Sequence, residues 1–171
     1  VAVVGAGGIG FDVAELLTHR AHADPDAAFR DEWGIDGSLS RRGGLKPPAE
    51  SPGGRTVYLL QRKDTKVGSA LAKTTGWIRR TLLKKRGVAM LSGVEYVAID
   101  DAGLHLRVGG EPRTLEVDTV VICAGQEPRR ELVPELERRG IAPVLIGGAD
   151  VASELDAKRA IEQGTRAALA L

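Results

Sequence analysis

The chain has 171 residues, 43% of them hydrophobic and 27% charged, a composition typical of one globular domain with room for part of a second. A net charge of +1 and an aromatic content of 4% remove the electrostatic and stacking grounds for nucleic-acid binding, and no apolar run approaches the roughly 18 residues of a membrane span. The single cysteine, Cys123, excludes a disulfide framework and a self-contained iron–sulfur site, so a reducing, cytoplasmic setting is the simplest interpretation.

The first stretch of the chain predicts a buried parallel strand and a helix. Residues 1–4 form a short, continuous apolar run. A helix is expected from about Gly8, with Val13, Leu16 and Leu17 on one apolar face. Because natural chains rarely begin inside a central strand, we expect this chain to be a piece of a larger protein.

Residues 21–55 contain four prolines and six glycines, a density that breaks regular structure apart from a helical turn around residues 29–33. We interpret this segment as a long surface insertion. An insertion of this length is unusual in a compact domain, which suggests that it has a function or forms an interface.

The rest of the chain alternates strands and helices. The predicted elements are strands at 57–60, 88–91, 119–123 and near 144–146, helices at about 69–86 and 151–171, and an antiparallel meander at 94–99, 104–108 and 114–117. Strand–helix–strand order dominates, so the fold class is α/β. We expect a Rossmann-like domain with a mainly parallel sheet.

A glycine motif at residues 5–10 follows the first strand and opens the first helix, the context that gives such a motif its meaning. Gly5 permits a tight turn, Gly7 lets the backbone approach a pyrophosphate, and Gly10 lets the helix pack against the strand. The free N–H groups and the positive end of the helix dipole then face the anion. The alternative is a strand–helix turn without a ligand. The candidate contacts in this turn are Gly5, Gly7, Gly8, Ile9 and Gly10.

The end of the second strand predicts which nicotinamide cofactor is bound. An NAD site places an acid there to bind the ribose hydroxyls. This strand instead ends in Gln61, Arg62 and Lys63, with no acid before Asp64. A guanidinium and an ammonium group suit the 2′-phosphate of NADPH, although two solvated surface cations are the alternative.

Several polar residues near the predicted helices have two interpretations each. Asp12 lies in the first helical turn, where it either contacts the cofactor or only complements the dipole. Thr74 and Thr75 either meet a nicotinamide or cap the following helix. Trp77 either packs against the protein, the favoured interpretation, or stacks on the cofactor. Cys123 lies on a strand that is expected to be buried and should behave as a small hydrophobic residue.

Two later turns also have the composition of a dinucleotide site. The strand at 119–123 closes in a small-residue turn at Ala124 and Gly125. Further along, the apolar residues 144–146 precede Gly148 and Asp150, which together with the following helix N-terminus predict a phosphate-and-ribose site. Each turn is a weak signal alone, but their order is hard to obtain by chance.

With these motifs in place, the chain resembles the C-terminal region of bacterial NADPH-dependent 2,4-dienoyl-CoA reductases over essentially its whole length. The more particular stretches are Glu-Trp-Gly-Ile-Asp at 32–36 and Lys-Thr-Thr-Gly-Trp-Ile at 73–78. The others are residues 3–12, 60–63, 121–128 and 154–157.

The resemblance implies that electrons pass from NADPH to FAD, and then through an iron–sulfur cluster and FMN to a dienoyl-CoA. It implies an NADPH domain at residues 1–125, including the 21–55 insertion, and the closing piece of a split FAD domain at 126–171. The partner would be the rest of the parent chain, which would supply the flavin barrel, the cluster cysteines, the first half of the FAD domain and the catalytic residues.

Two other functions remain open from the sequence. One is the same region of a related flavoprotein, such as a trimethylamine-dehydrogenase-like enzyme or an enoate reductase. The other is a non-catalytic dinucleotide-sensing module, which we would expect to have a complete domain boundary.

Overall fold

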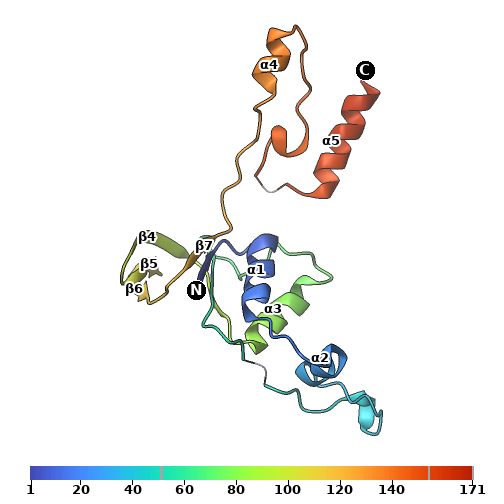
Figure 1. The fold of residues 1–171 in the computed structure, drawn as a ribbon, viewed down its shortest axis with the longest axis vertical. Coiled ribbons are helices and arrows are strands. Elements are labelled where there is room, and N and C mark those ends of the chain that lie inside the picture. The colour runs from blue at the N-terminus through green and yellow to red at the C-terminus, as the bar shows by residue number, and fades with distance from the viewer. Residues whose placement is uncertain (51, 154, 171) are drawn as a thin grey trace. The chain divides into compact units, whose positions relative to one another are not determined.

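The computed structural model describes residues 1–50, 52–153 and 155–170. The chain forms two compact units, Val1–Ala124 and Gly125–Leu171 (Figure 1). No helix in these described ranges is long and apolar enough to cross a membrane.

The first unit is built on a four-stranded parallel sheet, as the apolar runs predict. Its strands are β1 (Ala2–Val4), β2 (Tyr58–Leu60), β3 (Ala89–Leu91) and β7 (Val120–Ile122), in the order β3-β2-β1-β7. The central strand β1 pairs in parallel with β2 on one side and with β7 on the other. The carboxyl ends of β1 and β2 therefore meet at one edge of the sheet.

The two faces of the sheet bury different layers, because successive side chains of a strand point to opposite faces. Val3 packs with Phe11 and Leu83 in a core shared with the helices α1 (Gly8–Thr18) and α3 (Gly76–Lys85). The neighbouring residue of β1, Ala2, and the equivalent residues of β2 instead join a second core under the antiparallel strands.

The antiparallel meander consists of β4 (Val94–Asp100), β5 (Gly103–Val108) and β6 (Glu111–Leu115). The third strand begins at Glu111 rather than at residue 114, because its pairing with β5 starts directly after the two-glycine turn. His105 of β5 is bonded to Thr114 of β6 at 2.9 Å, which ties the two strands together. The α/β class with a parallel sheet and a meander is thus confirmed.

The insertion contains more regular structure than its composition predicts. Helix α2 (Pro25–Trp33) is nine residues long, where only a turn is expected at 29–33. The Asp24 carboxylate caps it by accepting from the N–H of Ala27 at 2.9 Å, and Gly34 ends it with φ 70°. The local signal was therefore the Asp-Pro pair at its start, which outweighs the helix-breaking composition that follows.

The loop after α2 is organised around Asp36. Its carboxylate accepts hydrogen bonds from the N–H and hydroxyl of Ser38, the hydroxyl of Ser40 and the N–H of Arg41. The Ser38 hydroxyl bond first, followed by the Arg41 N–H bond, holds the pKa of Asp36 well below its usual range. A 3-10 turn at Arg42–Gly44 and a bridge between Ile35 and Leu45 close the loop.

Two predictions about the helices are wrong in detail. Helix α3 begins at Gly76 instead of near residue 69, because Gly68 has φ 73° and the N–H of Gly76 closes a turn onto the carbonyl of Ala72. Helix α1 buries Phe11 and Ala14, whereas Leu16 is 72% exposed. The aromatic side chain fills the space over the sheet and rotates the buried face away from Leu16.

The second unit contains α4 (Val133–Arg138), the 3-10 turn η2 (Gly147–Ala149) and α5 (Ala157–Leu169). Helix α4 lies in a stretch for which no helix is expected. Residues 144–146 are not a strand: they have no pairing partner in the described part of the chain. The last helix begins at Ala157 instead of residue 151, because the Asp156 carboxylate accepts from the N–H of Arg159 at its start.

Candidate dinucleotide-binding site

Two glycines of the first turn are required by the packing of the fold. Gly5 has φ 107°, and a Cβ there would lie 2.8 Å from the carbonyl oxygen of Cys123 at the end of β7. A Cβ on Gly10 would overlap the carbonyl oxygen of Gly5. These contacts let α1 start directly against the end of β1, which is the close helix–strand approach that the motif predicts.

The other two glycines of the turn face open space. A Cβ built on Gly7 or Gly8 would meet no atom within 4 Å. Gly7 is the N-cap of α1, and no side chain among the described residues caps that helix end. The N–H groups of the first turn, Ile9 included, therefore remain available to an anion. The turn thus fits a pyrophosphate group, because Gly5 and Gly10 pack closely against the protein while the backbone N–H groups next to Gly7 and Gly8 face open space.

Asp12 lies one residue beyond the first turn of α1, because the helix begins at Gly8, so the prediction of an acid in the first turn is wrong. Its carboxylate forms an ion pair with Arg79 of α3. The pair joins the two helices that cover this face of the sheet. Asp12 is therefore already engaged by the protein, and a contact to the cofactor through its second oxygen remains a prediction. Sequence reasoning missed Arg79, because no local pattern connects two residues 67 positions apart.

The N-terminus of α3 differs from its predicted form. Thr75 is the N-cap residue, but its hydroxyl makes no capping bond within the described residues. Trp77, expected to be packed, is 54% exposed, because α3 starts late and turns this position to solvent. The indole is thus not part of the hydrophobic core.

The tip of β2 carries three of the predicted contacts, Gln61, Arg62 and Lys63. Arg62 and Lys63 are exposed, and they follow β2 at the edge where β1 runs into the glycine turn. Burial raises the pKa of Tyr96 in β4. The positive charge of Arg62 acts in the opposite direction and lowers the pKa of this phenol. The cationic tip therefore follows the strand that pairs with β1, and its charge acts on Tyr96 of the meander.

The first acid after the strand is directed elsewhere. The Asp64 carboxylate lies 3.3 Å from the position that a Cβ of Gly93 would take, in the turn between β3 and β4. Gly93 has φ 64°, and its N–H donates to the carbonyl of Lys63 at 3.2 Å. Asp64 thus lies against the turn between β3 and β4.

The end of β7 closes the floor of the glycine turn. The N–H of Cys123 donates to the carbonyl of Val4 at 2.7 Å, and the Ala124 Cβ lies 2.9 Å from a Cβ built on Gly5. Cys123 is partly exposed instead of buried, because it follows the last paired residue of the edge strand; the burial that remains raises the pKa of its thiol. Gly125, with φ 83°, begins the second unit.

The insertion is fastened to the C-terminal end of α3. Arg86 donates to both carboxylate oxygens of Glu32, at 2.9 and 3.2 Å, and the two side chains are only 12% and 11% exposed. Lys85 donates to the Glu32 carbonyl at 2.7 Å, and its ammonium lies 5.4 Å from the centroid of the Trp33 ring. The insertion is therefore a docked part of the first unit.

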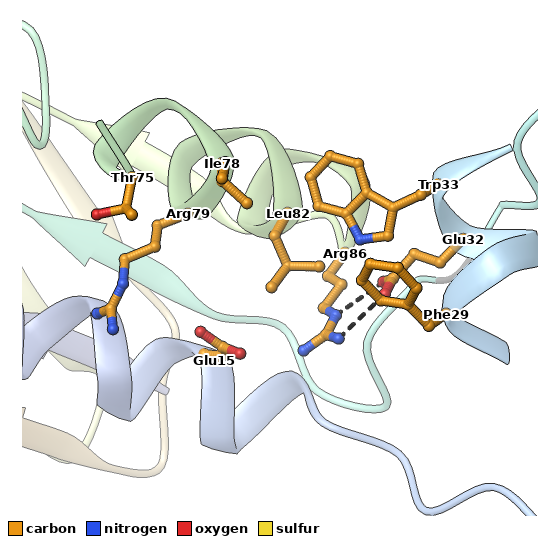
Figure 2. Close-up of a pocket in the computed structure, with 9 residues that line it drawn as sticks. All are labelled: Glu15, Phe29, Glu32, Trp33, Thr75, Ile78, Arg79, Leu82 and Arg86. Carbon is orange, nitrogen blue, oxygen red and sulfur yellow. Dashed lines mark hydrogen bonds and ion pairs between the residues drawn. The ribbon is translucent and has the colours of Figure 1, made fainter. Parts of the chain in front are cut away.

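Figure 2 shows the groove that this docking leaves between α1, α2 and α3. It has a volume of about 370 Å³ and combines apolar side chains with two ion-paired arginines. Its lining residues are Glu15, Phe29, Glu32, Trp33, Thr75, Ile78, Arg79, Leu82 and Arg86. The glycines of the turn are not among them, so this groove is separate from the candidate pyrophosphate site.

In the second unit, the turn η2 is organised by one side chain of α5. The Gln163 amide oxygen accepts from the N–H of Gly147 at 2.7 Å, and its nitrogen donates to the Asp150 carboxylate at 2.8 Å. Arg130 donates to the carbonyl oxygens of Ala149 and Asp150. Gly148 lines a shallow hollow with Ala149, Ala152 and Leu155 from the same turn, and with residues 126, 127 and 129. Sequence reasoning missed Gln163, because its two partners lie 16 and 13 positions earlier in the chain and no local pattern connects them.

Residues 1–155 match the protein family described as pyridine nucleotide-disulphide oxidoreductase. No group of three or more metal-ligating side chains occurs in the described ranges. The chain is also similar in fold to solved structures of much larger chains.

A 2-naphthoyl-CoA reductase solved with 2-naphthoyl-CoA is 18% identical, with a TM-score of 0.62; the match covers 95% of this chain and 20% of that one. A bacillithiol disulfide reductase from Bacillus cereus is 16% identical with a TM-score of 0.49, covering 78% of this chain and 31% of that one. At such identities the similarity concerns the fold alone. This chain spans about a fifth of the naphthoyl-CoA reductase.

Proposed function

Because the chain belongs to the pyridine nucleotide-disulphide oxidoreductase family, whose members bind FAD and NAD(P)H, we propose that its first unit binds NADPH and delivers a hydride to FAD. It is a dinucleotide-binding region of a flavoprotein oxidoreductase that matches part of longer chains.

The main support for this function is that the four glycines of the turn have two different surroundings. Gly5 and Gly10 are closed by protein atoms, whereas Gly7 and Gly8 face open space at an uncapped helix N-terminus. A strand–helix turn without a ligand needs only the first pair. The open pair supports a pyrophosphate in contact with the backbone N–H groups.

Arg62 and Lys63 support NADPH over NADH as the ligand. They stand at the tip of β2, where an NAD site has an acid, and Asp64 lies against the β3–β4 turn. Charge-assisted hydrogen bonds from Arg62 and Lys63 would hold the 2′-phosphate. The nicotinamide supplies the hydride; the protein's part is to orient the dinucleotide along the sheet edge.

We further propose that the parent enzyme is a 2,4-dienoyl-CoA reductase. The stretches at 32–36 and 73–78 support this assignment. The first of them includes Glu32, which fastens the insertion to α3. The 2-naphthoyl-CoA reductase, a protein solved with an acyl-CoA, is consistent with it through its fold. FMN, the iron–sulfur cluster and the acyl-CoA site would lie in the rest of the parent chain.

The second unit is proposed to be the closing piece of a split FAD domain. Gly148 and Asp150 lie on a turn that faces a shallow hollow, and Asp150 keeps one carboxylate oxygen beyond the one bonded to Gln163. Residues 144–146 are apolar and strand-like in composition, but lack a paired neighbour in the described part of the chain. A strand contributed by the rest of the FAD domain would pair with them.

The test is the double variant Arg62→Ala, Lys63→Ala in the full-length enzyme. We expect kcat/KM for NADPH to fall about tenfold or more, the worth of one or two charge-assisted contacts, while kcat/KM for NADH changes little. Lys66→Ala, an exposed cation three residues further on, is the matched control and should behave as the wild type. Equal losses for NADPH and NADH would refute the assignment.

A second test uses the 171-residue chain itself with NADPH and a dienoyl-CoA. Only background turnover is expected, because one cysteine cannot ligate a cluster, and the strands of the described residues form a parallel sheet and a meander in place of a flavin barrel. Sustained reduction of the dienoyl-CoA would contradict the division of the activity between this chain and the rest of its parent.

A further inference from the structure

Gln61, the first residue after β2, is held by backbone hydrogen bonds to two other segments of the chain. Its backbone N–H donates to the carbonyl of Leu91 at 2.8 Å, and its carbonyl accepts from the N–H of Val94 at 3.0 Å. Gln61 is therefore tied on both sides of its peptide to β3 and β4. The residues that follow it, 62 to 66, are all exposed.

The side chain of Gln61 folds over this exposed segment. Its Nε2 group donates to the carbonyl of Lys63 at 2.9 Å, to the carbonyl of Thr65 at 2.8 Å and to the hydroxyl of Thr65 at 3.1 Å. An amide nitrogen has only two hydrogens, so its donor capacity is already used. The amide nitrogen of Gln61 is thus unavailable to a ligand while the loop keeps this form.

We propose that Gln61 is a positioning residue that determines NADPH specificity by fixing the loop that carries Arg62 and Lys63. The inference rests on the proposed NADPH site and deepens it. By holding the carbonyl groups of Lys63 and Thr65, Gln61 sets the backbone direction at both cations before the ligand arrives. The loop then loses its conformational entropy on folding instead of on binding, so this loss does not reduce the affinity for the ligand.

The sequence predicts Gln61 to be a direct contact of the cofactor. Its hydrogen bonds instead support an indirect role, in which it holds the loop that carries Arg62 and Lys63. This role predicts an effect on the 2′-phosphate alone, because the pyrophosphate and nicotinamide lie against other parts of the site. A direct contact of Gln61 with the ribose would affect phosphorylated and unphosphorylated nucleotides alike.

Gln61→Glu is the most informative variant, because Glu has the same shape and cannot donate when ionised. Its carboxylate would face two carbonyl oxygens and repel them, so the loop would lose this form. Thr65→Val removes one of the three acceptors and should have a smaller effect. Ser69→Ala removes only the 3.4 Å contact to the Thr65 hydroxyl and is the matched control.

The experiment measures the affinities of adenosine 2′,5′-bisphosphate and AMP for the full-length protein by calorimetry. The ratio of the two dissociation constants reports the 2′-phosphate site. In Gln61→Glu we expect this preference to fall about tenfold with AMP affinity unchanged, and in Thr65→Val about twofold, in line with the loss of one or two hydrogen bonds. Ser69→Ala should keep the wild-type ratio, and thermal unfolding should show each variant folded.

Three outcomes would overturn the inference. A wild-type ratio in Gln61→Glu would show that the loop does not depend on the amide. An equal loss for both nucleotides would show a direct or global role. If the Arg62→Ala, Lys63→Ala variant also keeps the wild-type ratio, the proposed NADPH site itself is wrong. If the ratio falls in that double variant but not in Gln61→Glu, the site stands and only the proposed role of Gln61 is wrong.

Discussion

The two glycine turns of this chain, at residues 5–10 and 147–150, have similar compositions but differ in what holds them. The first follows a strand that is paired on both sides, and its conformation is fixed by contacts with β7 and α1. The second follows residues without strand pairing and is held by Gln163 and Arg130. A sheet fixes a turn through its backbone and leaves the N–H groups free, whereas side chains fix a turn by occupying some of them.

This difference bears on which turn is ready for a ligand. The N–H groups at the start of α1 have no side-chain cap in the described structure, whereas the N–H of Gly147 is already bonded to Gln163. The first turn therefore has the features of a complete anion site within its own unit. The second offers Gly148 and Asp150 and, in our proposal, depends on further strands of a FAD domain.

The strongest test of this contrast is Gly7→Val. The new side chain would project into the space proposed for the pyrophosphate, so we expect NADPH affinity to fall about a hundredfold or more. Stability should remain near that of the wild type, because no protein atom lies within 4 Å of the new Cβ. Calorimetric titration and thermal unfolding measure the two effects.

The matched variant in the other turn is Gly148→Val, which should leave NADPH affinity unchanged. FAD should not bind specifically to the 171-residue chain, with or without the Gly7 substitution. If FAD binds and that binding is lost in Gly7→Val, the dinucleotide assigned to the first turn is wrong.

Gly10→Ala tests the part of the first turn that is closed. Its methyl group would overlap the Gly5 carbonyl, so the helix and strand must move apart, at a cost of about 3 kcal/mol in the free energy of unfolding. Gly8→Ala, which meets no atom within 4 Å, should leave stability within about 0.5 kcal/mol of the wild type. Urea denaturation measures both; equal losses would mean that the two glycine pairs do not differ.

Gln163→Leu tests the side-chain support of the second turn. The Gly147 N–H would lose its partner, and we expect this unit to be destabilised by about 1–3 kcal/mol with no change in NADPH affinity. Faster hydrogen exchange at Gly147 is the measurement. Glu162→Gln, which weakens only an exposed ion pair with Arg166, should have an effect of at most about 0.5 kcal/mol. Unchanged exchange in Gln163→Leu would show that Arg130 and the helix suffice.

The smallest expected effect concerns pH and the Asp36 loop of the first unit. The folded state lowers the pKa of Asp36, so the stabilisation is present above its ordinary value of 3.8 and is lost as pH falls through the lower folded value. Asp36→Asn should flatten the acid limb of the stability curve for this loop and leave stability at neutral pH slightly reduced. Amide exchange at Ser38 and Arg41 between pH 5 and the acid range measures it; a variant as acid-sensitive as the wild type would contradict the expected role.

The parallel sheet and the first turn could be predicted because their signals are local. Each strand is a short apolar run, and the glycines occur at fixed spacing after one of them. The exposed face of α1 could not be predicted, because it depends on how Phe11 fills the core. The late start of α3 could not be predicted either, because it depends on a turn closed by the N–H of Gly76. Local composition misjudged the insertion, where a single capping residue, Asp24, outweighs the breakers around it.

The long-range contacts of the first unit were beyond the sequence for a related reason. Arg79 and Asp12 are 67 residues apart, and Arg86 and Glu32 are 54 residues apart, so their meeting depends on the finished packing of three helices. The loop bonds of Gln61 span only two and four residues, yet no pattern predicts that its amide bonds inward instead of to a ligand. The residue types at the site were predictable, but several of their partners were not.

The Glu32–Arg86 pair also constrains how this domain can change over evolution. A surface loop commonly tolerates substitution, but replacing Glu32 alone, with the insertion still in place, would leave the Arg86 guanidinium, 12% exposed, without its carboxylate. Loss of the acid at position 32 would therefore require a second, compensating substitution on α3. A descendant that keeps the insertion and lacks Glu32 should show an uncharged residue in place of Arg86.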